Sequence, residues 1–100
     1  MNLPIACTLT EAELRQRRQI IMATFQSMRI NASELDDGYA FSFPASSEAL
    51  QSIAELVDME RQCCPFLTFK IVIEAANASM RLEVTGSGEA KKVIAEYFRF

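Results

Sequence analysis

The chain has no histidine and no tryptophan among its 100 residues. Without histidine it lacks the usual general base near neutral pH, the Ser-His-Asp and Cys-His arrangements, and imidazole ligands for zinc. We therefore do not expect a hydrolytic or acid–base enzyme, and the reactive groups that remain are thiols and carboxylates. The three cysteines, an odd number, favour free thiols or metal ligands over a set of structural disulfides.

An excess of positive charge and long apolar runs are also missing. Thirteen acidic and ten basic residues leave a net charge of −3, so no overall positive field draws the chain onto nucleic acid or anionic lipid. Stretches without charge, such as 19–28 and 38–47, are too short to cross a bilayer. Residues 1–7 lack the basic start and the apolar core of a secretion signal. We therefore expect a cytoplasmic protein that binds neither nucleic acid nor membrane.

The hydrophobic pattern predicts a single domain, 1–100, in which helices alternate with hairpins. Thr10 and Glu13 have the spacing of a capping box at the start of a helix. Pro65 ends the second helix because its ring disfavours the helical conformation at the residue before it. The expected elements are a helix at 11–28, strands at 30–35 and 39–43, a helix from Ser46 or Ser47 to Cys63, strands at 66–74 and 80–85, and a last helix through Val93 and Phe98.

This order, α-β-β-α-β-β-α, predicts an α+β two-layer sandwich. The second helix would connect two hairpins of one four-stranded sheet, and the helices would cover one face of it. Alternation along the strands places Tyr39, Phe41 and Phe43 on the covered face, and it leaves a charged outer face on the second hairpin.

The helix faces are read from the same pattern. In the second helix the expected buried stripe contains Leu50, Ile53, Ala54 and Val57. In the first helix, the basic run at 15–18 is expected to be a solvated face.

The segment around the two adjacent cysteines departs from ordinary packing patterns. Glu60 precedes Cys63 and Cys64 by three and four residues, so on a helix its carboxylate approaches both thiols. Adjacent Cα atoms are about 3.8 Å apart, below the range of about 4.4 to 6.8 Å for disulfides, so a bond between these two cysteines would be strained. In a regular helix the side chains of adjacent residues point about 100° apart, so they cannot bind one ion together. The break in the helix at Pro65 could direct both sulfurs to the same ion.

Cys7 supplies a third sulfur just before the first helix. If the first two helices pack antiparallel, Cys7 approaches the cysteine pair. Thiolates prefer Zn(II), Cu(I) or heavier thiophilic ions to magnesium or calcium. Our leading hypothesis is therefore a small cytosolic thiol protein that binds a soft metal or metalloid ion through Cys63 and Cys64, with Cys7 and Glu60, for sequestration, delivery or sensing.

Two alternatives stay open. Free cysteine often behaves as a small buried hydrophobe, and a glutamate near a helix end is ordinarily solvated. The chain would then be a non-enzymatic homodimeric interaction module that uses the open sheet face or the aromatic residues Phe66, Tyr97, Phe98 and Phe100. The other alternative is a redox-responsive thiol protein, in which an oxidised cysteine is resolved by a neighbouring one.

The segment Glu60–Leu67 resembles the E-x-x-C-C-P-F segment of a group of small, largely uncharacterised bacterial proteins. The similarity extends to Ala6–Thr10, Gly38–Pro44 and Leu82–Gly86, and so spans nearly the whole chain. The resemblance implies a single domain and supplies no mechanism. Matched residue by residue, the resemblance points to five positions of interest, which are Cys7, Glu60, Cys63, Cys64 and Pro65.

Overall fold

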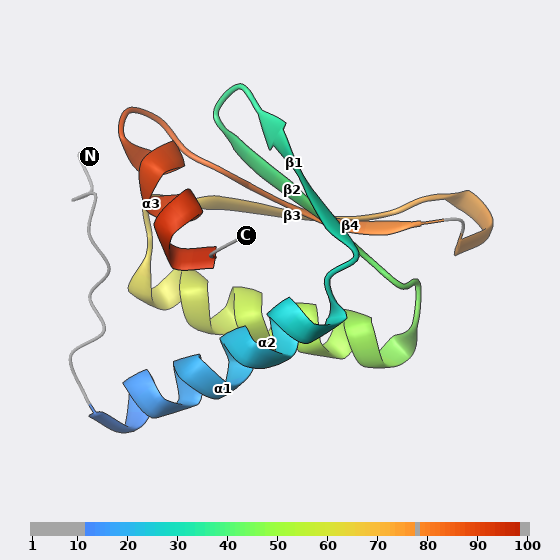
Figure 1. Cartoon of the computed structure of the whole chain (residues 1–100), viewed down its shortest axis with the longest axis horizontal. Coiled ribbons are helices and arrows are strands. Elements are labelled where there is room, and N and C mark those ends of the chain that lie inside the picture. The colour runs from blue at the N-terminus through green and yellow to red at the C-terminus, as the bar shows by residue number, and fades with distance from the viewer. Residues whose placement is uncertain (1–11, 78, 99–100) are drawn as a thin grey trace.

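The computed structural model describes residues 12–77 and 79–98, without the side chains of residues 12–15, 17, 63, 77 and 97. Its element order is the predicted one, and the fold class is α+β (Figure 1). The elements are α1 (Ala12–Met28), β1 (Asn31–Leu35), β2 (Gly38–Phe43), α2 (Ser47–Cys63), β3 (Thr68–Ile73), a 3-10 turn (Ala75–Asn77), β4 (Met80–Thr85) and α3 (Ala90–Phe98).

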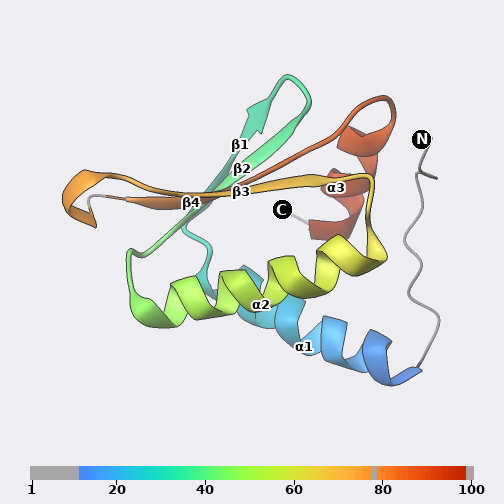
Figure 2. The ribbon, with the colours of Figure 1, turned by 180° about the vertical axis from the view of Figure 1, so that it is seen from behind.

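The four strands form one antiparallel sheet in the order β1-β2-β4-β3. The helix α2 carries the chain from the first hairpin to the far edge of the sheet, so that β2 and β4 become the central strands. All three helices lie on the same side of the sheet (Figures 1 and 2). The result is a two-layer arrangement in which no described element covers the other sheet face, and β1 and β3 are the edge strands.

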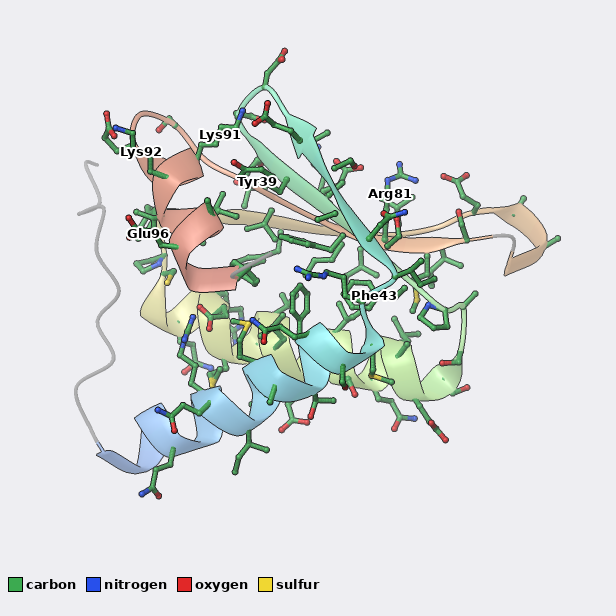
Figure 3. All side chains as sticks on the ribbon, in the orientation of Figure 1. Tyr39, Phe43, Arg81, Lys91, Lys92 and Glu96 are labelled. Carbon is green, nitrogen blue, oxygen red and sulfur yellow. The ribbon has the colours of Figure 1, made fainter. Side chains whose placement is uncertain are left out.

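The predicted alternation of the strands is confirmed. Phe41 pairs with Leu82, and both are fully buried under the helices. Figure 3 shows Phe43 pointing toward the helices, whereas Arg81 points away from them on the open face. The outer face of the second hairpin is charged as expected, because Arg81 contacts Glu74 at 2.7 Å and Glu83 at 2.8 Å.

Aromatic rings form the centre of the core. The ring centroids of Phe25 and Phe41 are 5.1 Å apart, and those of Phe41 and Phe98 are 5.5 Å apart. Because Phe98 is fully buried, α3 is attached to the core by this residue. Phe98 therefore belongs to the core and not to an exposed aromatic patch, two roles that the sequence left open, while Phe100 lies outside the described residues.

The helix α2 has defined ends. The side chain of Ser46 accepts a hydrogen bond from the N–H of Ala49 at 3.1 Å, which caps the first turn. Cys63 is the last helical residue, as predicted, and the N–H of Cys64 still donates to the carbonyl oxygen of Glu60 at 2.7 Å. Pro65 lacks an N–H group, so this hydrogen-bond pattern ends there.

The buried face of α2 is rotated from the expected stripe. Ala54 is exposed, whereas Leu56 is fully buried. The reason is that α2 packs against both α1 and the sheet, so the buried face is set by two neighbours. Within the described residues, none of the helices combines the length and the hydropathy that crossing a bilayer requires.

Candidate functional site

The helices α1 and α2 run antiparallel below the sheet, so the first half of α1 lies beside the end of α2 (Figures 1 and 2). Arg18 and Glu60 meet there, with 2.7 Å between Nε of the arginine and Oε1 of the glutamate. The side chain of Glu60 is fully buried and that of Arg18 is 16% exposed. The sequence predicted a solvated face for Arg18, and it left open whether Glu60 is a metal ligand or a solvated acid at the helix end. The structure shows that neither side chain is solvated in this way.

The burial of Glu60 follows from its position in α2. It lies seven residues after Ile53 and four after Leu56, which are also buried, and these spacings return to the same side of a helix. Removing a carboxylate from water is unfavourable, and the guanidinium of Arg18 offsets part of that cost. The spacing was visible in the sequence, but the position of Arg18 depends on how α1 packs against α2.

Cys64 lies directly against this ion pair. Its side chain is fully buried, and its sulfur is 3.5 Å from Oε2 of Glu60. Cys64 is disulfide-bonded in the structure, which differs from the expectation of free thiols. The predicted approach of the Glu60 carboxylate to the sulfur of Cys64 is confirmed. Cys7 and the side chain of Cys63 lie outside the described part of the structure.

The backbone after Cys64 forms a tight turn that brings the chain back to the sheet. The N–H of Leu67 donates to the carbonyl oxygen of Cys64 at 3.1 Å, and Leu67 is buried. Gln62 and Pro65, on either side of this position, are exposed. The sulfur of Cys64 is therefore covered, although the helix end that carries it reaches the protein surface.

The soft-ion site remains a prediction. No group of three or more histidine, cysteine, aspartate or glutamate side chains suited to a metal occurs among the described residues. Of the four predicted ligands, the structure brings together Cys64 and Glu60. A ligand role for Glu60 would compete with Arg18 for the carboxylate, because Oε1 already contacts the guanidinium.

Comparisons of the chain with known protein families, curated proteins and solved structures gave no match. The resemblance of Glu60–Leu67 to a bacterial group therefore remains an expectation from the sequence. The chemistry of the site follows from its own atoms, which are a sulfur in a disulfide, a buried carboxylate next to it, and an arginine that holds the carboxylate in place.

Proposed function

We propose that this chain is a small redox-responsive thiol protein in which Cys64 alternates between a disulfide and a thiol. The observation that carries the proposal is the position of the fully buried Glu60 carboxylate, 3.5 Å from the sulfur of a disulfide-bonded cysteine. A buried ion pair is weak support for a purely structural role, because well-packed apolar residues often stabilise a protein as well or better.

The step is a thiol–disulfide exchange with a low-molecular-weight thiol. A thiolate of the reductant attacks the sulfur of the cysteine bonded to Cys64, the S–S bond breaks, and Cys64 leaves as a thiolate that takes up a proton. A second reductant thiolate releases the other protein cysteine and forms the oxidised reductant. The exchange moves two electrons and two protons. In the reverse direction, Glu60 accepts the proton of Cys64 as its thiolate forms.

The burial of Cys64 indicates that its sulfur is the leaving group of the exchange and not the sulfur that the reductant attacks. A sulfur without exposed surface is inaccessible to a reductant, so the attacked sulfur is that of its partner. The other cysteines of the chain are Cys7 and Cys63. Of these, Cys7 suits an unstrained bond better, because the Cα atoms of Cys63 and Cys64 are only about 3.8 Å apart as chain neighbours.

We place this cycle in the cytoplasm. Disulfides are rare in that reducing compartment, and those that form there are ordinarily transient, catalytic or redox-sensing. In this setting the thiol form of Cys64 would be the resting state, and an oxidising change would produce the disulfide. The protein would then report or buffer a change in thiol redox poise.

The number of free thiols is expected to change with the redox poise of glutathione. We expect three free thiols in the chain under reducing conditions and one under oxidising conditions, measured by alkylation and mass spectrometry of the intact protein. The Cys64→Ser variant should keep two free thiols throughout. Cys7→Ser and Cys63→Ser then identify the partner, since only one of them removes the transition. Three free thiols at every poise would refute the proposal.

Glu60→Gln is expected to slow disulfide formation at Cys64 by about tenfold or more at neutral pH, because positioned proton acceptors typically contribute about 10² to 10⁴ in rate. The amide keeps the size of the side chain but does not accept the thiol proton. Disulfide formation is followed by quenched alkylation after a jump to oxidised glutathione, on protein whose near-ultraviolet circular dichroism matches the parent. Asp58→Asn, at an exposed acid of the same helix, is the matched control. An unchanged rate in Glu60→Gln would exclude Glu60 from the proton transfer.

A further inference from the structure

Among residues 12–77 and 79–98, no strand pairs with the outer edge of β3, and two isoleucines beside this edge are exposed. Ile71 and Ile73 are cross-strand partners of the buried Leu82 and Met80, so they lie on the helix-covered side of the sheet. They are nevertheless 38% and 46% exposed. Soluble proteins ordinarily protect an edge strand and cover apolar surface next to it.

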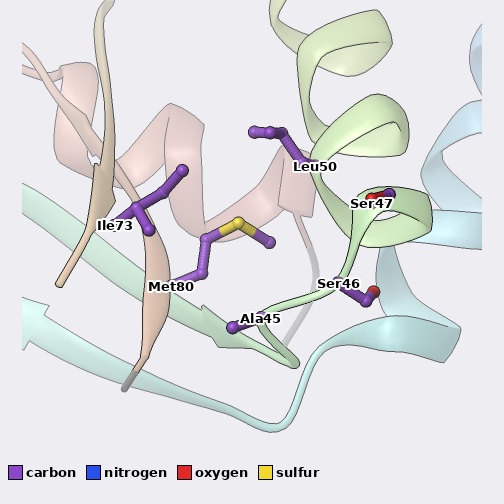
Figure 4. Close-up of a pocket in the computed structure, with 6 residues that line it drawn as sticks. All are labelled: Ala45, Ser46, Ser47, Leu50, Ile73 and Met80. Carbon is purple, nitrogen blue, oxygen red and sulfur yellow. The ribbon is translucent and has the colours of Figure 1, made fainter. Parts of the chain in front are cut away.

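A pocket of about 190 Å³ adjoins this edge (Figure 4). It lies between the start of α2 and the strands, where Leu50 of the helix faces Ile73 and Met80. The helix α2 contacts β3 but leaves Ile71 and Ile73 partly uncovered, and this apolar surface continues from Ile73 into the pocket.

The backbone of β3 has hydrogen-bonding groups directed to this open edge. The N–H of Glu74 donates to the carbonyl oxygen of Ser79 at 3.0 Å, on the side of β4. Because these groups alternate in direction along an antiparallel strand, the even-numbered residues face β4. The N–H and C=O groups of Ile71 and Ile73 consequently point to the open edge.

The charged residues of β3 and its end are placed symmetrically about Val72. Lys70 and Glu74 lie two residues before and two residues after it, and both are exposed. Hydrogen bonds to Glu74 and then to Glu83 raise the pKa of Arg81. The side chain of Glu74 keeps 49% of its surface exposed in this contact, so it is accessible to a second cation.

We propose that two copies of this chain pair through β3, antiparallel, about a two-fold axis at Val72. In this register Lys70 of each copy faces Glu74 of the other. Ile71 of each copy faces Ile73 of the other, and these residues exchange the backbone hydrogen bonds of the open edge. The two four-stranded sheets join into one, and the isoleucines cover each other beside the pocket.

Charge complementarity favours this register over the others. It also favours a second copy of the chain over other peptides at this edge. With the axis at residue 71 or 73, a charged residue would face Val72 instead of an opposite charge. With the axis at residue 70 or 74, two like charges would face each other, which is unfavourable. Any extended peptide could satisfy the edge hydrogen bonds, but the self-complementary spacing of Lys70 and Glu74 matches a second β3.

The dimer is expected to be weak and reversible. One strand pair with four isoleucines buries less than the roughly 1,200 Å² of a standard interface, so we expect a dissociation constant on the order of 100 µM. Sedimentation equilibrium of the wild-type chain up to about 1 mM measures it. A chain that remains monomeric at that concentration would overturn the proposal.

Charge exchange between the two positions tests the register. Lys70→Glu alone creates two Glu–Glu pairs and Glu74→Lys alone creates two Lys–Lys pairs, so each variant is expected to dimerise at least tenfold more weakly. An equimolar mixture of the two variants restores both opposite-charge pairs and should form heterodimers with about the wild-type affinity. Arg81 keeps its contact with Glu83 in Glu74→Lys, and circular dichroism verifies the fold.

Lys92→Glu is the matched control, because it makes the same charge change at an exposed residue of α3. It should leave the dissociation constant within about twofold of wild type. Unchanged dimerisation of Lys70→Glu, or a mixture of the two variants that stays monomeric, would refute pairing about Val72.

Discussion

Arg18→Met is expected to lower the free energy of unfolding by about 3 kcal/mol or more at neutral pH, since breaking a buried ion pair from one side costs about 3 to 5 kcal/mol. The variant removes the guanidinium that lies 2.7 Å from a carboxylate without exposed surface. Methionine retains much of the apolar stem, so lost packing contributes little. Urea denaturation followed by circular dichroism measures the change, with the same thiol state in all samples.

The double variant Arg18→Met, Glu60→Leu distinguishes two contributions to the free energy of unfolding. One is the cost of burying the Glu60 charge alone, and the other is the net contribution of the ion pair. Without either charge, the helix interface becomes apolar, and most of the lost stability should return. Arg61→Met is the control, because its ion pair with Asp58 is 61% exposed on both sides and contributes at most about 1 kcal/mol. If Arg18→Met and Arg61→Met lost the same small amount, the expected cost of leaving the Glu60 charge buried without the guanidinium would be refuted.

Phe41→Ala is expected to lower the free energy of unfolding by about 3 to 5 kcal/mol, the usual cost of removing a large ring from a packed core. Phe41 is fully buried in the central strand β2, with the rings of Phe25 and Phe98 at 5.1 and 5.5 Å. One substitution therefore removes contacts that join α1, β2 and α3. The same denaturation measurement applies to this variant.

Phe69→Ala provides a matched comparison for this loss. Phe69 lies on the same sheet face but in the edge strand β3, where it is half-buried. A smaller loss of stability is expected there, because less apolar surface returns to water and the site can relax. Equal losses for the two phenylalanines would contradict a core centred on β2 and α1.

The architecture was predictable because its signals are local. The alternation from Tyr39 to Phe43 and the proline after Cys64 each act within a few residues of the chain. The strand order was not predicted, because it depends on which strand of the first hairpin pairs with the second hairpin, and on which strand of the second hairpin makes that pair. The exposed isoleucines of β3 follow from that order, since only an edge strand leaves covered-face residues partly uncovered.

The candidate site was predictable only in part. The spacing of Glu60 and Cys64 brings a carboxylate to a sulfur on one helix end, and the structure confirms this. The burial of Glu60 and the presence of Arg18 beside it were missed. Both follow from the packing of α1 on α2, and no pattern within either helix alone specifies its neighbour.

Residues near one another in the chain thus set the helices, the hairpins and the pairing of a sulfur with a carboxylate, because capping, alternation and helical spacing are short-range effects. Assembly of the layers determined which charges lost contact with water, which strand kept an open edge and which side of α2 became buried. Those outcomes depend on contacts between segments far apart in the chain, where one surface excludes water from another.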